Sequence, residues 1–346
     1  MLSKLAVPDI DHVFSKVSNY WHQLHRKHIL LTGGTGFIGK WLMEVILEAD
    51  RRLDLRCHIS VLTRNPSKFI ASTPHLAKET RVTLVTGDIR NFSAPNSAHY
   101  DVVIHAAADV IAQGNFLDVF NTCIEGTRRV LEVAQERGTE RFLLISSGAV
   151  YGPQPSDVIS IPETFSGGPN TLDIRSGYAE GKRAAEWLTN SYGQEGLNVN
   201  IARCFAFLGP YMALEKQFAI GNFIDAALRN RAIVIRGDGT PLRTYLYAAD
   251  LAAWLLIILL ASKPGDVFNV GGDVAISIEE LALRVLEVTG TNSGLKVLRP
   301  RSQDARVERY VPDVSKARKL LGLLPWIAID DAIDRTVRWH RFGSKG

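Results

Sequence analysis

Residues 27–39, KHILLTGGTGFIG, join a short apolar strand to a glycine-rich turn and the start of a helix. The apolar run HILLT is too short for a helix and is typical of a strand buried on both faces. Gly33, Gly36 and Gly39 suit a tight turn, close approach of the backbone to a pyrophosphate and close packing of the next helix. That helix would present its N-terminal N–H groups to an anion. The stretch therefore predicts a dinucleotide-binding turn rather than an ordinary strand-to-helix connection.

The composition is that of a globular protein of 346 residues, long enough for one large domain with a smaller lobe. A formal net charge of +4 is too small to indicate a nucleic-acid binder. Cys57, Cys123 and Cys204 contain no CxxC pair, so neither a disulfide framework nor a zinc site is expected. We expect reduced core thiols and no bound metal.

Neither the N-terminus nor the longest apolar run of this sequence indicates insertion into a membrane. The N-terminus lacks the tripartite pattern of a signal peptide, and the apolar run at residues 251–261 is too short to cross a bilayer. This run, capped by Asp250, is expected to form a buried helix. Apolar residues at spacings of three and four over residues 9–24 predict an amphipathic helix in an N-terminal extension, residues 1–27. We expect a cytoplasmic protein.

Predicted strands and helices alternate after the glycine turn, which is typical of a doubly wound parallel α/β (Rossmann) sheet. Strands are expected at residues 28–32, 58–62, 82–86, 102–105, 142–145 and 198–202, with helices at 37–48, 115–137 and 178–192. After residue 203 strands and helices alternate less regularly. Helices are expected at 217–229, 248–261, 278–289 and 330–341, and strands at 233–235, 267–270 and 296–298. We predict a dinucleotide-binding domain over residues 28–203, to which 242–275 return, and a smaller C-terminal α/β substrate lobe made of 204–241 and 276–346.

Three polar side chains form a predicted acid/base set. Ser146 and Ser147 follow a predicted strand, at the sheet edge where ligands of such folds bind. Tyr178 and Lys182, in YAEGK, are four residues apart and so share one helix face. An ammonium beside a phenol would lower the pKa of Tyr178, and a serine hydroxyl could hydrogen-bond the oxygen that changes charge during hydride transfer. Ser147, Tyr178 and Lys182 thus suit carbinol and carbonyl chemistry, although this Tyr/Lys spacing is also common on surface helices.

Five motifs in order carry a resemblance: TGGTGFIG at 32–39, GDI at 87–89, HAAA at 105–108, SSGAVYG at 146–152 and YAEGK at 178–182. The sequence resembles the extended short-chain dehydrogenase/reductase family, and within it the NAD(P)-dependent nucleotide-sugar epimerase/dehydratase branch. The match covers nearly the whole chain after residue 27.

The resemblance implies roles for the matching positions on the cofactor side. Ser147 would be the catalytic serine, Tyr178 the acid/base, and Lys182 its partner and a ligand of the nicotinamide ribose. Asp88 would contact the adenine, and the alanines of HAAA would let the cofactor pass close to the fourth strand. The predicted cofactor-binding set is Gly33, Gly36, Phe37, Ile38, Gly39, Arg64, Asp88, Ile89, Ala106, Ala107, Ala108, Tyr178 and Lys182.

The resemblance also implies a substrate site. GDGTPLRTYLYAADLA at residues 237–252 resembles the family stretch whose arginine, here Arg243, grips the nucleotide diphosphate. A planar guanidinium fork suits a diphosphate because it donates paired hydrogen bonds. Asn222 would contact the nucleotide, and Val234 and Arg236 would flank its base. The predicted substrate-binding set is Ser147, Asn222, Val234, Arg236, Arg243, Arg299, Arg306 and Arg309, one of the last three adding a second phosphate contact.

The chain departs from the family pattern at two places. Members that dehydrate or decarboxylate sugars usually carry an acid one or two residues after the catalytic serine or threonine, where this chain has Gly148 and Ala149. No carboxylate would then be available there to eliminate water across the sugar ring, which disfavours 4,6-dehydratase chemistry. Ala206 stands where many relatives have an asparagine that touches the substrate. The sugar itself is therefore not assigned.

We predict hydride transfer at a hydroxyl or keto carbon of a nucleotide-diphosphate sugar, by a 4-epimerase or a 4-keto reductase. One alternative is a reductase of a non-sugar carbonyl, which the Arg243 stretch disfavours. Another is a cofactor-sensing protein without turnover, which would be expected to lack Tyr178 or Lys182. No nucleic-acid or membrane partner is expected.

A homodimer is expected from the family, in which the helices at residues 115–137 and 178–192 pair across a two-fold axis. The first of these helices carries an apolar stripe that includes Phe116, Val119, Phe120 and Cys123. The alternative is that this stripe faces only its own sheet.

The end of the second predicted strand bears on the choice of cofactor. NAD-selective sites usually place Asp or Glu there to accept from the ribose 2′-hydroxyl, whereas a 2′-phosphate needs a cation. Here HISVL runs into TRNP, which contains no acid. Arg64 could pair with a 2′-phosphate or stack beneath the adenine, so NADP is slightly favoured over NAD. The alternative is a solvated loop arginine, with NAD held by other contacts.

Overall fold

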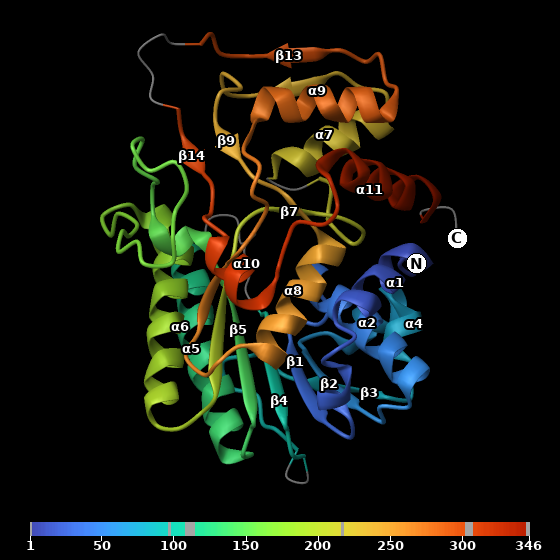
Figure 1. Cartoon of the computed structure of the whole chain (residues 1–346), viewed down its shortest axis with the longest axis vertical. Coiled ribbons are helices and arrows are strands. Elements are labelled where there is room, and N and C mark those ends of the chain that lie inside the picture. The colour runs from blue at the N-terminus through green and yellow to red at the C-terminus, as the bar shows by residue number, and fades with distance from the viewer. Residues whose placement is uncertain (1, 96–97, 108–114, 216–217, 302–306, 344–346) are drawn as a thin grey trace.

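The computed structural model describes residues 2–95, 98–107, 115–215, 218–301 and 307–343. Within them, seven strands form one parallel sheet in the order β11-β6-β5-β4-β1-β2-β3. The strands are β1 (His28–Thr32), β2 (His58–Thr63), β3 (Val82–Thr86), β4 (Val102–His105), β5 (Arg141–Ser147), β6 (Val199–Cys204) and β11 (Val267–Val270). The chain reverses its direction of travel across the sheet between β1 and β4, which is where such folds bind ligands. The doubly wound parallel sheet is confirmed (Figure 1).

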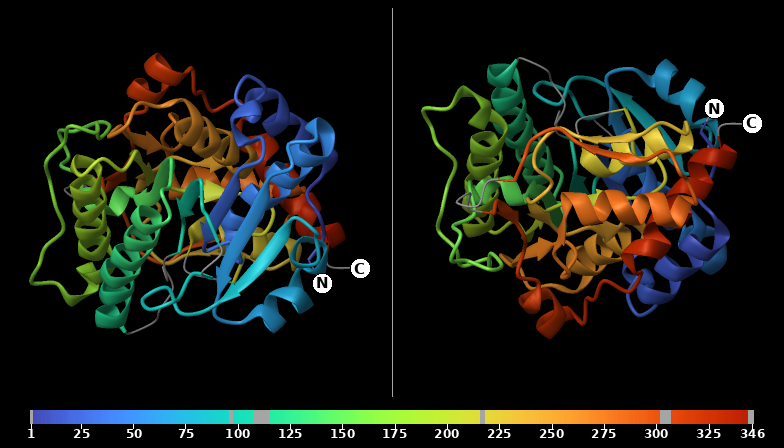
Figure 2. Two further views of the ribbon diagram at one scale, coloured as in Figure 1. Left: turned by 90° about the horizontal axis from the view of Figure 1, so that it is seen from below. Right: turned by 90° about the horizontal axis from the view of Figure 1, so that it is seen from above.

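Helices cover both faces of this sheet (Figure 1, Figure 2). On one face, α2 (Phe37–Leu53) and α8 (Ala248–Ala261) share an apolar core with α1 (Val7–Lys16). On the other face, α5 (Phe116–Glu136) and α6 (Gly177–Gln194) pack side by side. Helix α8 is apolar on every side and buried along nearly its whole length, as expected of a core helix. None of the helices in the described part of the chain is long and apolar enough to span a bilayer.

The turn between β1 and α2 depends on missing side chains. Gly33 has a φ of +71°, and a Cβ there would lie 2.7 Å from the backbone of Ala106. A Cβ at Gly39 would lie 2.4 Å from the Gly33 carbonyl oxygen. Because neither side chain exists, β1 runs directly into α2, whose first helical residue is Phe37.

The N-terminal extension differs from the single helix that we expected over residues 9–24. Helix α1 ends at Lys16, and a separate 3-10 turn, η1 (Trp21–Leu24), follows. In a continuous helix the Phe14 carbonyl would accept the Ser18 N–H, but it accepts the indole N–H of Trp21 at 3.0 Å. The apolar positions that made the pattern helical are nevertheless buried, namely Ile10, Val13, Val17, Trp21 and Leu24.

Asp250 does not cap α8 as expected. The N-cap residue is Tyr247, and Asp250 lies in the first turn with none of its surface exposed. Its carboxylate contacts the His12 ring of α1 at 2.7 Å and accepts the Ile327 N–H at 2.9 Å. Asp250 therefore holds two distant segments against α8.

The segments after β6 build a smaller group of elements beside the main sheet, at the top of Figure 1. Helices α7, α9 and α11 pack together, β8 pairs with β13, β9 pairs with both β12 and β14, and β10 pairs with β7. Their bounds are β7 (Phe207–Leu208), α7 (Ala219–Leu228), β8 (Ile233–Ile235), β9 (Leu242–Arg243), β10 (Leu246–Tyr247), β12 (Ile276–Ser277), α9 (Ile278–Thr289), β13 (Leu295–Val297), β14 (Arg309–Tyr310) and α11 (Ile329–Gly343).

Several short elements had no counterpart among the expected ones. Besides the short strands β7, β9, β10, β12 and β14, they include α3 (Pro66–Ser72), α4 (Pro74–Ala77), η2 (Gly148–Tyr151), η3 (Ile174–Ser176) and α10 (Ser315–Leu321). Apart from the helix expected over residues 9–24, the longer expected helices and strands are present in the described residues, with ends that shift by a few residues. Strand β11 lies at the edge of the main sheet, next to β6.

The apolar stripe of α5 faces α6 of the same chain. Val119 and Cys123 are buried, as are the other two cysteines, and none of the three is in a disulfide. A Cβ at Gly181 of α6 would lie 2.8 Å from the Cys123 Cβ and 3.3 Å from the Phe120 Cα. Gly181 thus lets the two helices approach closely, and this contact uses the stripe that we had assigned to a dimer interface.

Because the β1–α2 turn has no room at Gly39, we expect Gly39→Ala to lower the free energy of unfolding by about 1–3 kcal/mol. Urea unfolding followed by circular dichroism measures this change. Gly237→Ala is the matched control, since nothing lies within 4 Å of a Cβ there. Its effect should stay within about 0.5 kcal/mol. Equal losses of unfolding free energy in the two variants would show that crowding at Gly39 does not cause the destabilisation.

Candidate active site

The carboxyl end of β5 carries Ser147 to the edge of the sheet. The turn η2 begins at the next residue, and the Ser147 hydroxyl accepts the Ala149 N–H at 3.1 Å. This hydrogen bond caps the turn and fixes the hydroxyl. Ser147 is buried, with 8% of its surface exposed.

Tyr178 and Lys182 lie one turn apart in α6, which packs against β5. Lys182 is buried, and its Nζ donates to the Ile145 carbonyl at 2.8 Å. Burial lowers the pKa of Lys182, because the charged form loses its hydration, and Cys123, Cys204 and Glu186 act in the opposite direction. The ammonium therefore ties α6 to β5 two residues before Ser147.

The pKa of Tyr178 does not move in the direction that we expected from its spacing to Lys182. Burial raises this pKa, and the nearby Ser147 hydroxyl opposes the rise. The other main influences are Tyr310, Cys123 and Cys204, which raise the pKa further; Lys182 is not among them. The expectation failed because the ammonium is held at the Ile145 carbonyl rather than at the phenol.

Tyr310, which was not among the predicted site residues, also lies close to Ser147. It lies in β14, which pairs with the β9 strand of Arg243. Its hydroxyl is 2.7 Å from the position of a Cβ built on Gly148, the residue after Ser147. Burial raises the pKa of Tyr310, and the Ser147 hydroxyl again acts in the opposite direction. Two phenols therefore lie near one serine hydroxyl.

The residues expected to hold a dinucleotide gather at the carboxyl ends of β1 and β4. Gly36 is the N-cap of α2, and Phe37, Ile38 and Gly39 form its first turn. Ala106 and Ala107 follow β4, and their N–H groups bond to the Thr32 backbone and hydroxyl oxygens at 3.2 Å each. A Cβ at Gly33 would lie 2.7 Å from the Ala106 backbone, so the glycine turn packs directly against the residues that follow β4, at the start of a helix. These residues fit a dinucleotide; Ala108 lies outside the described residues.

Two further cofactor-side residues lie at the ends of β2 and β3. Arg64 is exposed, and its charge helps to lower the pKa of Asp88. The larger cause is Arg90, whose Nε donates to the Asp88 carboxylate at 2.9 Å. Asp88 is therefore near Arg64 but already paired. Ile89 packs on α5, 2.9 Å from a Cβ built on Gly126.

The predicted substrate residues fall into two groups. Arg243 and Arg309 lie on the paired strands β9 and β14, and the Arg243 guanidinium lies 5.9 Å from the ring centre of Tyr310. Arg243 also pairs with the exposed Glu308. The second group is Asn222 in α7, Val234 in β8, Arg236 after it and Arg299, all exposed, with the Arg299 N–H bonded to the Gly237 carbonyl at 3.3 Å. Arg306 lies outside the described residues.

Residues 29–271 match the sequence profile of the NAD dependent epimerase/dehydratase family. The chain belongs to this family. UDP-glucuronic acid decarboxylase 3 from Arabidopsis thaliana is 30% identical over 317 residues, covering 88% of this chain and 86% of the relative. UDP-glucuronic acid decarboxylase 1 from Xenopus tropicalis is 28% identical, covering 91% and 72%. The resemblance read from the five motifs is confirmed.

Solved structures of similar proteins agree with this membership. An epimerase from Methanothermobacter thermautotrophicus has a TM-score of 0.77 at 24% identity, covering 94% of this chain and 95% of its own, and so shares the fold. The dTDP-glucose 4,6-dehydratase DesIV from Streptomyces venezuelae, with NAD bound, has a TM-score of 0.74 at 26% identity, covering 91% and 97%. The protein is thus an enzyme of a family that depends on NAD.

A largely buried ion pair next to Ser147 connects α6, β5 and β6. Glu186, one turn after Lys182, accepts the Ser146 hydroxyl at 2.6 Å and pairs with Arg203 of β6 at 2.7 Å. Arg203 also donates to the Tyr151 hydroxyl at 2.9 Å. Sequence reasoning missed this network, although the four-residue spacing from Lys182 to Glu186 was a usable signal.

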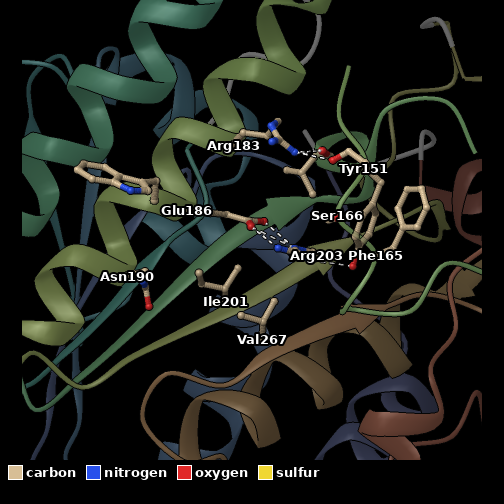
Figure 3. Close-up of a pocket in the computed structure, with 12 residues that line it drawn as sticks. Tyr151, Phe165, Ser166, Arg183, Glu186, Asn190, Ile201, Arg203 and Val267 are labelled. Atoms are coloured by element: carbon tan, nitrogen blue, oxygen red, sulfur yellow. Dashed lines mark hydrogen bonds and ion pairs between the residues drawn. The ribbon is translucent and has the colours of Figure 1, made fainter. Parts of the chain in front are cut away.

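A cavity of about 410 Å³ lies on the outer side of this ion pair (Figure 3). Ser147, Tyr178 and Lys182 do not line it. The Glu186–Arg203 pair forms part of its wall, and Trp187 of α6, which is 69% exposed, lies at its side. Its lining residues are Val150, Tyr151, Phe165, Ser166, Gly167, Arg183, Glu186, Trp187, Asn190, Ile201, Arg203 and Val267.

Proposed function

We propose that the protein is a 4-epimerase or 4-keto reductase of a nucleotide-diphosphate sugar. The observation that carries the proposal is the meeting of Ser147 and Tyr178 at the carboxyl edge of β5, with Lys182 buried one turn away. These groups can exchange a proton with a carbinol and hydrogen-bond its oxygen. Family membership supports a nucleotide-sugar substrate, because the curated relatives are named for UDP-glucuronic acid.

The surroundings of Ser147 support this reaction over sugar decarboxylation or dehydration. Those reactions are associated in the family with an acid at the position of Gly148 or Ala149. A side chain at position 148 would meet Phe205 and Tyr310, each 2.7 Å from its Cβ. Glu186, a buried carboxylate of the neighbouring helix α6, is already paired with Arg203. The two positions therefore offer a bound sugar no acid.

Each residue of the set has one task in the oxidative direction. Tyr178, as a phenolate, takes the proton of the sugar hydroxyl while Ser147 donates a hydrogen bond to the same oxygen. Lys182, held at the Ile145 carbonyl one turn along α6, would bind the ribose hydroxyls. A bound nicotinamide cofactor would supply the hydride acceptor. An epimerase would run both directions on one sugar, and a reductase only one.

The position of Arg243 supports a diphosphate substrate. Its guanidinium lies 5.9 Å from the ring centre of Tyr310, whose hydroxyl in turn lies beside Gly148. A diphosphate held there would place an attached sugar toward Ser147. Glu308, which now pairs with Arg243, is exposed and would give way to the more highly charged diphosphate.

If Tyr178 is the acid/base, Tyr178→Phe should preserve NAD binding and lower turnover by roughly 10²- to 10⁴-fold. Turnover is measured with NAD or NADP and a panel of UDP- and dTDP-sugars, by nicotinamide absorbance and by identifying the sugar product. Tyr100→Phe is the matched control, because Tyr100 is fully buried and precedes β4, at the opposite edge of the sheet. Turnover within threefold of the parent for Tyr178→Phe would remove it from the set. Release of CO₂ from UDP-glucuronic acid would contradict the proposed reaction.

The proposed preference for NADP rests on Arg64 and on the missing acid at the end of β2. Dissociation constants for the two oxidised cofactors decide it, and we expect the smaller one for NADP. Arg64→Ala should then weaken NADP binding by about tenfold or more and leave NAD unchanged, because one charged hydrogen-bonding partner is lost. Lys68→Ala, in the exposed first turns of α3, serves as the control. An unchanged ratio in Arg64→Ala would show that this arginine does not select the cofactor.

The proposed homodimer would form through α5 and α6. Although the α5 stripe packs inward, each helix still exposes one large apolar side chain, Leu117 at 64% and Trp187 at 69%. We expect light scattering at micromolar concentration to give twice the chain mass, and Trp187→Lys to shift the mass toward the monomer. A monomeric parent protein would rule the dimer out.

A further inference from the structure

The position next to Ser147 is filled from another part of the chain. Gly148 has no side chain, and the ring of Phe205 and the hydroxyl of Tyr310 occupy the space where one would lie, each 2.7 Å from the built Cβ. Phe205 follows β6, and Tyr310 belongs to β14. The structure thus brings a hydroxyl group from a distant strand to the residue beside the proposed catalytic serine.

We propose that Tyr310 is a positioning residue of the catalytic set, whose hydroxyl donates to Ser147 and thereby directs the serine proton toward Tyr178 and the substrate oxygen. This inference rests on the proposed function, because the proposed function assigns Ser147 and Tyr178 their roles in proton transfer. The inference goes beyond the proposed function by adding the hydroxyl group of Tyr310 to the set.

The hydrogen-bonding capacity of a serine hydroxyl supports this arrangement. The group has two acceptor lone pairs and one proton to donate. Ser147 already accepts the Ala149 N–H at 3.1 Å. A hydrogen bond donated by the Tyr310 hydroxyl would use the second lone pair of the Ser147 oxygen. The serine proton would then be left to point at Tyr178 or the reacting oxygen. Burial raises the pKa of Tyr310, which keeps its phenol neutral and able to donate.

The surroundings of Tyr310 fix its ring independently of its hydroxyl. The ring centre lies 4.6 Å from that of Phe205 and 5.9 Å from the Arg243 guanidinium. The backbone of Tyr310 is opposite Arg243 in the β14–β9 pair. Tyr310→Phe would therefore keep the packing and remove only the oxygen, which makes it a clean test of the hydroxyl.

A double-mutant cycle on turnover separates positioning from packing. Tyr310→Phe should lower kcat by about tenfold, the loss expected from one hydrogen bond, without changing NAD affinity. Ser147→Ala should lower it further. If Tyr310 acts through Ser147, the double variant should be no slower than Ser147→Ala alone. Losses that multiply would show that the two residues act independently. Tyr100→Phe again serves as the control for removing a buried phenol hydroxyl.

The second measurement does not need a sugar substrate. Phenolate absorbance is titrated with saturating NAD in the parent, in Tyr178→Phe and in Tyr310→Phe. The Tyr178 phenol is faced by Ser147 from β5, Tyr310 from β14, Cys123 from α5 and Cys204 from β6, with Lys182 one turn away on its own helix. A hydrogen bond relayed through Ser147 stabilises the phenolate, so losing it should raise the midpoint of the transition that Tyr178→Phe abolishes.

The two ways of failing are distinguishable. A parent protein that turns over no nucleotide sugar would overturn the proposed function, while the titration would still decide whether Tyr310 supports the ionisation of Tyr178. Normal turnover with an unchanged midpoint and multiplying losses would overturn the role of Tyr310 alone.

Discussion

The geometry of the site depends on the buried pair between Glu186 and Arg203. Both side chains are largely removed from water, which is costly, and such a pair is stable only when its remaining donors and acceptors are satisfied. Here Ser146 donates to the carboxylate, and the guanidinium also donates to Tyr151 and to the Glu163 carbonyl. Because Ser146 precedes Ser147 and Glu186 follows Lys182 by one turn, the pair fastens the strand half of the predicted set to its helix half.

Most of the fold could be predicted because its signals are local. The β1 strand, the glycine turn and the alternation of strands with helices each need only a few neighbouring residues. The two errors have distant or side-chain causes. The helix expected over residues 9–24 ends early because the Trp21 indole takes the Phe14 carbonyl, and Asp250 is no cap because His12 and Ile327 hold its carboxylate. No window of helical spacing contains those partners.

The site divides in the same way. Ser147 could be identified because it ends a strand, and Tyr178 and Lys182 because they share one helix face. Tyr310 could not be identified, because no pattern in the sequence around it indicates that it lies close to Gly148. The two residues come together through the pairing of β14 with β9. The direction of the Tyr178 pKa was wrong for a related reason. Spacing along a helix shows which groups are close, but burial, which here dominates, is a property of the whole fold.

Similarity to decarboxylases does not by itself decide the reaction, since the fold fixes the place of the cofactor and only a few side chains decide what happens to the sugar. In this chain those side chains are coupled. An acid introduced at position 148 alone would meet Phe205 and Tyr310, so it could enter only if both rings moved. The rings are in turn held by each other and by the strand that carries Arg243. The chemistry beside Ser147 and the strand expected to grip the diphosphate are therefore one packed unit. A change of reaction would require several of these positions to change together.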